Sequence, residues 1–151
     1  MLRDKITEAM KEALRAKDER TLATTRLMIS KMRDLDIEAR TKGKMDGIGD
    51  EEILIMLQGM VKQRRESIVL YEKGKRDDLV KQEAEEISVI EKFMPKQMTD
   101  EEVKTSIEKI VTELGASTIR DVGRVMAQLK KNYLGQMDFS KAGAVVRTLL
   151  S

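Results

Sequence analysis

Helical spacing of the apolar residues is the feature that most constrains this chain. They recur three or four positions apart along most of its length, and no stretch alternates convincingly at the period of two typical of a strand. The composition agrees, because Ala, Leu, Met, Glu, Lys and Arg are abundant, whereas the 151 residues include one Pro and 3% aromatic residues. We therefore predict an all-α, multihelical protein.

Seven helices are expected from the apolar stripes and their start and stop signals. Four precede Pro95, at about 2–17, 19–41, 50–73 and 77–94. Three follow, at about 100–114, 118–132 and 140–150. Asp18 is the expected cap of the second helix, and Gly74 and Gly115 are the expected stops of the third and fifth.

The best candidate for a domain boundary is the segment 95–98. Pro95 disfavours helical backbone at the residue before it, and Thr99 with Glu102 forms a capping-box pattern that starts a new helix. We therefore predict an N-terminal subdomain of four long helices over residues 1–95 and a C-terminal three-helix subdomain over residues 99–151.

The absence of two residue types from the sequence excludes many kinds of catalysis. The chain has no His and no Cys, so it lacks an imidazole base, a thiol nucleophile and the usual zinc ligands. The carboxylates Glu83, Glu85, Glu86 and Glu91 are weak candidates for acid–base work, because adjacent residues diverge on a helix. No Gly-rich phosphate loop is present. The sequence therefore predicts no catalytic residue, no cofactor and no metal.

The same features bear on location. The absence of Cys fits a reducing compartment. The first residues lack an apolar leader, and no run approaches the roughly 18 apolar residues that a spanning helix needs. We expect a cytoplasmic protein without a membrane partner.

Positive charge is concentrated late in the chain. From Gly115 onward the chain has six basic and two acidic residues, which gives a local net charge of +4 (6 − 2). At about 100° per residue, Arg120, Arg124 and Lys131 project to nearly one side of the predicted helix. Its apolar residues Val122, Met126 and Leu129 project to the other side. This basic ridge is a candidate RNA contact, with Lys130 and Arg147 as secondary contacts. The alternative is an ordinary solvated face.

A second basic group comprises Lys62, Arg64 and Arg65. It is a candidate secondary contact for an anion or an RNA backbone. The alternative is intramolecular and is favoured here, because the apolar stripe of the third helix should continue at position 64 or 65. An Arg on that stripe would pair with acids such as Glu83 or Glu86 of the fourth helix.

Two glycines, Gly123 and Gly143, interrupt the last two predicted helices. Gly inside a helix costs about 1 kcal/mol relative to Ala, so each position has some need for space. Close helix–helix contact is one explanation, and close approach of an RNA backbone beside Arg124 is the other.

Several segments together resemble the YqeY family. They are Thr25 to Leu27, Lys62 to Ile68, Arg76 to Leu79, Glu83 to Ile87, Glu91 to Glu102 and Asp121 to Met126, and their order and spacing agree along nearly the whole chain. Departures are few: Gly49 stands where the family usually has a Thr cap, Val122 where Met is common, and Arg124 where Lys is usual.

The resemblance implies an all-helical protein of two parts, related to the C-terminal tail of GatB, the B subunit of the tRNA-dependent amidotransferase. That tail contacts tRNA, which implies a contact region around 121–126. The expected partner is tRNA or another structured RNA, with an aminoacyl-tRNA or amidotransferase component beside it. Two alternatives stay open: a protein–protein adaptor with no RNA role, and a carbon–nitrogen ligase activity with glutamine as amido donor.

Overall fold

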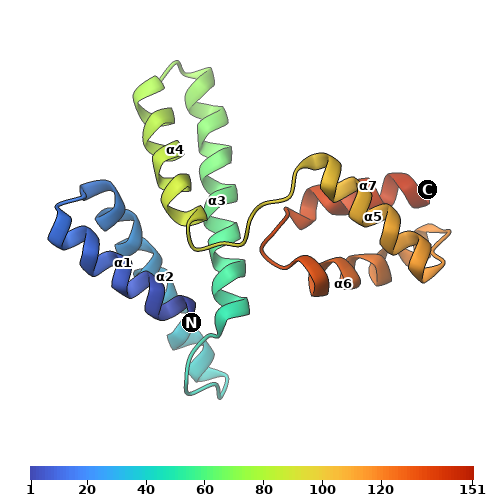
Figure 1. Ribbon diagram of the computed structural model, residues 1–151, viewed down its shortest axis with the longest axis horizontal. Helices are drawn as coiled ribbons and strands as arrows, with labels where there is room; N and C mark the ends of the chain where they lie inside the picture. The colour runs from blue at the N-terminus through green and yellow to red at the C-terminus, as the bar shows by residue number, and fades with distance from the viewer. The chain divides into compact units, whose positions relative to one another are not determined.

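The computed structural model describes residues 1–151, and its regular elements are all helices with no strand, which confirms the predicted fold class (Figure 1). The chain divides into two compact units, Met1–Met94 and Pro95–Ser151. Each unit has a hydrophobic core of its own. No helix combines the length and apolar character required to cross a membrane.

Two antiparallel helix pairs build the N-terminal unit (Figure 1). Helix α1 (Leu2–Ala16) lies beside α2 (Glu19–Thr41), and α3 (Asp50–Lys73) lies beside α4 (Asp77–Glu91). The Asp18 carboxylate accepts a hydrogen bond from the Thr21 N–H at 3.2 Å, so the predicted cap of α2 is confirmed. Short turns therefore fold each pair back on itself, and α2 also contacts α3 and α4.

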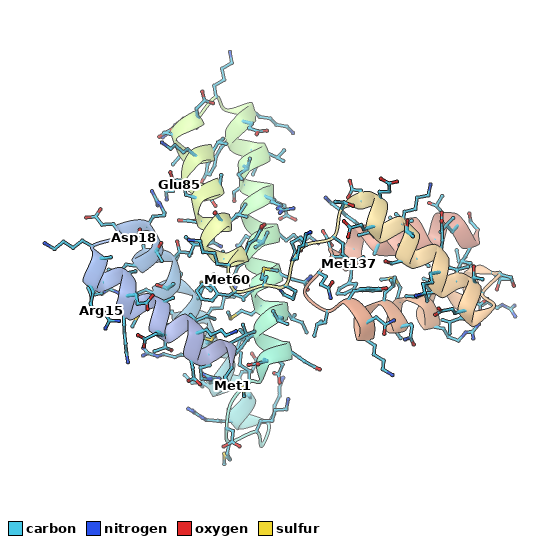
Figure 2. The ribbon with its side chains drawn as sticks, in the orientation of Figure 1. Met1, Arg15, Asp18, Met60, Glu85 and Met137 are labelled. Atoms are coloured by element: carbon cyan, nitrogen blue, oxygen red, sulfur yellow. The ribbon has the colours of Figure 1, made fainter.

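The core of this unit is made of aliphatic and methionine side chains from all four helices. Its fully buried members are Ile6, Met28, Met32, Ile53, Leu57 and Ile90. Burial of each contributes about 1.5–3 kcal/mol. Met60, labelled in Figure 2, extends the core along α3. Methionine is flexible enough to fill the irregular space between two helix pairs.

A buried carboxylate ties α1 to the loop after α2. Asp36 accepts two hydrogen bonds from the Arg3 guanidinium, at 2.7 and 2.8 Å, and one from the Ile48 N–H at 2.9 Å. These bonds hold the pKa of Asp36 below its usual range, with the Arg3 hydrogen bond as the largest cause. Gly47 has a φ of +82°, and a Cβ there would collide with this carboxylate.

One predicted helix end in this unit was wrong, and a second helix ends where predicted but through a different turn. Helix α4 stops at Glu91 rather than 94, because Phe93 and Met94 donate to carbonyls three residues back in a tight turn before Pro95. Helix α3 ends at Lys73 as expected, but Gly74 has a φ of −84° and Lys75 takes the left-handed conformation instead. The Arg76 N–H then donates to the Tyr71 carbonyl and closes the turn.

The C-terminal unit contains α5 (Asp100–Leu114), a 3₁₀ turn η1 (Ile119–Asp121), α6 (Val122–Tyr133) and α7 (Phe139–Leu150). The Thr99 side chain accepts from the Glu102 N–H at 3.1 Å, which confirms the predicted start of α5. Gly115 ends that helix in the left-handed conformation, with a φ of +63°. The fully buried core residues of the C-terminal unit include Ile107, Val125, Leu129, Ala142 and Val146.

Candidate nucleic-acid interface

The start of α6 is fixed by one carboxylate. Asp121 accepts hydrogen bonds from the N–H groups of Ser117 and Thr118, at 3.0 and 3.2 Å, and from the Arg124 guanidinium at 2.9 Å. The bond from Ser117 is the largest cause that lowers the pKa of Asp121 to about 2. The carboxylate therefore stays ionised at neutral pH and holds Arg124 beside the first turn of the helix.

Helix α6 buries one side and exposes the other, as its sequence pattern predicts. Leu129 is fully buried, and Val122 and Met126 pack against the same core. Val125 is fully buried as well and was not predicted. The five basic residues of the candidate interface are all exposed: Arg120, Arg124, Lys130, Lys131 and Arg147. The apolar back therefore anchors α6 in the unit and leaves cationic groups in solvent.

The predicted ridge is regular over only two of its three members. Arg124 and Lys131 are seven residues apart on α6, so they share one side at a separation of about 10 Å along the axis. Arg120 lies in the 3₁₀ turn, whereas the sequence placed it on a continuous helix from residue 118. The capping arrangement of Thr118 and Asp121 tightens this turn, so the α-helical step does not fix where Arg120 projects.

Lys130 and Arg147 lie near a different part of the surface, where α6 packs on α7. Lys130 comes one turn after Met126 and so shares its side of α6. On α7, a Cβ placed at Gly143 would lie 3.7 Å from the Met126 Cε and 3.4 Å from the Arg147 Nη1. Both distances are ordinary van der Waals contacts, so the space at Gly143 would accommodate a Cβ and helix–helix packing does not require a glycine there.

The two acidic residues after Gly115, Asp121 and Asp138, lie at the starts of helices and accept hydrogen bonds there. Asp121 precedes α6, and Asp138 accepts from the Ser140 N–H at 2.8 Å at the start of α7. Of the basic residues, only Arg124 forms an ion pair with one of them. The exposed surface of this segment is therefore strongly cationic, although the net charge of the whole chain is only +2.

The second basic group is largely engaged inside the N-terminal unit. Arg64 pairs with the buried Glu86 of α4 at 3.0 Å, and both side chains are about nine-tenths buried, at 12% and 11% exposure. Arg65 pairs with Glu91 at 2.9 Å, and Lys62 is exposed on α3. The intramolecular alternative thus accounts for Arg64 and Arg65.

The carboxylates of α4 serve the same packing. Glu85, labelled in Figure 2, accepts from the Arg20 Nε of α2 at 3.2 Å, and Glu86 lies 3.8 Å from another nitrogen of Arg20. Burial, and secondarily the charge of Glu86, raises the pKa of Glu83. No three or more acidic side chains are grouped so that they would hold a metal ion.

The fold and this surface define a class: a small all-helical protein of two units, with exposed cations on the second. The chain belongs to the YqeY-like protein family, whose model matches residues 3–150.

Curated relatives carry the description "Altered inheritance of mitochondria protein 41, mitochondrial". The relative from Kluyveromyces lactis is 30% identical over 115 residues, covering 74% of this chain and 60% of the relative. The relative from Saccharomyces cerevisiae strain S288c is 30% identical over 131 residues, covering 86% and 66% respectively. The chain thus spans about two-thirds or less of the length of these relatives, which are described as mitochondrial.

Proposed function

We propose that the C-terminal unit is a non-catalytic module that binds tRNA or another structured RNA, and that it serves tRNA-dependent amidation or another step of aminoacyl-tRNA handling. The observation that carries the proposal is the exposed cationic surface of η1, α6 and α7, whose only two acidic residues start helices. Arg offers a planar donor fork for phosphate oxygens, and Lys offers a point charge.

The role of each group follows from its position. Arg124 and Lys131 would contact phosphates about two helical turns apart, and Arg120 would extend the contact beyond the start of α6. Lys130 and Arg147 would add contacts near the α6–α7 seam. The part played by amidation rests on the resemblance to the GatB tail.

The test is tRNA binding by the full chain at about 50 mM and about 200 mM salt. The three ridge contacts alone predict a roughly 20- to 40-fold loss of affinity between these concentrations, and contacts from Lys130 and Arg147 would enlarge this loss. The variant Arg120→Ala/Arg124→Ala/Lys131→Ala should bind at least about tenfold more weakly at the lower salt concentration and lose most of the salt dependence.

A matched control removes the same charge from the same unit. Lys96, Lys104 and Lys109 are exposed and lie outside the proposed interface. The variant Lys96→Ala/Lys104→Ala/Lys109→Ala should bind within about twofold of wild type. Equal binding by wild type and the ridge variant would show that the ridge is not the RNA contact.

The alternative of a ligase activity has its own test. Conversion of a mischarged tRNA by the purified chain, with glutamine as amido donor, would contradict the non-catalytic proposal. We expect no conversion, because the chain contains neither a Cys nucleophile nor a His base.

A further inference from the structure

Three arginines of α2 are set apart from all the others in the N-terminal unit. The unit contains nine arginines, and six of them form ion pairs with carboxylates: Arg3, Arg15, Arg20, Arg64, Arg65 and Arg76. The remaining three, Arg26, Arg33 and Arg40, form no such ion pair and are exposed, although the charge of Arg40 acts on the buried Asp36. Arg40 donates only to the Met45 carbonyl, at 3.3 Å.

These three residues form a regular stripe. They are spaced seven residues apart on one uninterrupted helix, so they lie within about 40° of one another and are separated by about 10 Å along its axis. Asp34 and Glu38 lie about a quarter turn or more around α2, whereas Asp36 lies within about 60° of Arg33 and Arg40 but is buried and bonded to Arg3. Glu38 already pairs with Lys42. We call Arg26, Arg33 and Arg40 the arginine stripe.

Apolar side chains accompany the stripe. Leu27 and Ile37, on the solvent side of α2, are 50% and 59% exposed. Six positions follow the alternating steps of four and three residues that define a coiled-coil seam: Ala23, Leu27, Ser30, Asp34, Ile37 and Thr41. Three of them are apolar and one, Asp34, is acidic. Each arginine immediately precedes one of the positions 27, 34 and 41. The arginine stripe therefore flanks a partly apolar seam, as charged residues flank the seam of a coiled coil.

We propose that this face of α2 docks an acidic amphipathic helix of a partner protein. Carboxylates repeated every seven residues on such a helix match the spacing of the guanidinium groups, and its apolar side would cover Leu27 and Ile37. Phosphates of an RNA would satisfy the arginines but would leave both apolar side chains uncovered.

A second copy of α2 fits this face poorly. If two α2 helices paired antiparallel, the two arginine stripes would face and repel each other. If they paired parallel, Arg26 would face Lys31, and the one favourable ion pair would join Arg33 to Glu38. The proposal does not depend on RNA binding, because α2 belongs to the N-terminal unit.

The test uses a synthetic peptide of three heptads, with Leu at the seam positions and Glu at the flanking positions, and the full-length protein. A second peptide carries Gln in place of every Glu. The acidic peptide should bind wild type, and Arg26→Gln/Arg33→Gln/Arg40→Gln should weaken its binding about tenfold. The Gln peptide should bind wild type at least about tenfold more weakly than the acidic one.

Two further variants separate this site from general electrostatics. Lys11→Gln/Arg15→Gln/Arg76→Gln removes the same charge from exposed positions of the same unit and should change the affinity less than about twofold. Ile37→Ser leaves all charges in place and should weaken the peptide about fivefold by reducing the apolar contact. Circular dichroism of each variant would verify its helical content.

Four results would overturn the proposal. The first two are an equal loss of peptide affinity in the two triple variants and equal binding of the acidic and Gln peptides. The third is binding of a 21-base-pair RNA that requires the arginine stripe, with no binding of the acidic peptide. The fourth is a wild-type dimer, seen in sedimentation velocity, that the arginine-stripe variant does not form.

Discussion

At the scale of single residues, two glycines on exposed helix surfaces allow a test of whether a position without a side chain serves packing or RNA binding. An added Cβ at Gly123 in α6 or at Gly59 in α3 meets no atom within 4 Å. Neither glycine is therefore required by packing within the fold. Since Gly lowers helix stability, each carries a cost that packing within the chain does not offset.

We predict that Gly123→Ala raises the free energy of unfolding by up to about 1 kcal/mol, because Ala has the higher helix propensity and space is available. The same variant should lower tRNA affinity about threefold or more if a phosphate backbone approaches α6 beside Arg124. Chemical denaturation and a binding titration of one preparation measure both effects.

Gly59→Ala is the matched control for this pair of measurements. It should bring a similar gain in stability and leave tRNA affinity unchanged, because α3 lies outside the proposed interface. Unchanged affinity in Gly123→Ala would show that RNA does not approach this position closely.

At the scale of helices, sequence pattern predicted where elements occur better than which polar residues they bury. Caps at Asp18 and Thr99 and the stop at Gly115 are local signals, and the structure confirms all three. Asp36 and Glu86 are buried although they were not placed in the core. The apolar period of α3 predicted that an Arg at 64 or 65 would pair with an acid such as Glu86, whereas Arg3, the partner of Asp36, lies 33 residues away and no local period reveals it.

The candidate site shows the same division. Exposure of Arg124 and Lys131 and burial of Leu129 follow from helical spacing alone. The 3₁₀ turn that carries Arg120 depends on side-chain capping, and the contact of Met126 with Gly143 depends on how α7 crosses α6. Such contacts between elements are not encoded in the spacing of one helix.

The buried ion pair of Arg64 and Glu86 should contribute more to the specificity of helix packing than to the free energy of unfolding. We predict that Glu86→Leu destabilises the N-terminal unit by about 3 kcal/mol, because it leaves the Arg64 guanidinium buried without its partner. The double variant Arg64→Leu/Glu86→Leu should lie within about 1 kcal/mol of wild type, since two apolar side chains fit the same space.

Urea unfolding of both single variants and the double variant measures the coupling. Arg15→Ala is the control, because its pair with Glu8 is exposed and should be worth less than about 0.5 kcal/mol. Additive effects of Arg64→Leu and Glu86→Leu would contradict the inference that the two residues act as one buried pair.

At the scale of the whole molecule, the two units each contain what their proposed roles require. The core of the C-terminal unit uses buried residues from Ile107 to Leu150 and packs Met98 at its margin, so it closes without α1 to α4. The Gln97 side chain donates to the Gly135 carbonyl at 2.7 Å and the Met98 N–H to the Gln136 carbonyl at 2.9 Å, which fasten its first residues.

We predict that residues 95–151 fold alone, with a cooperative thermal transition by circular dichroism, and bind tRNA within about threefold of the full chain. A fragment of this size is only marginally stable, so its transition should come at a lower temperature than that of the full chain. The fragment should not bind the acidic peptide, because the arginine stripe lies on α2. A folded fragment that binds tRNA more than about tenfold more weakly than the full chain would require that the N-terminal unit also contacts RNA.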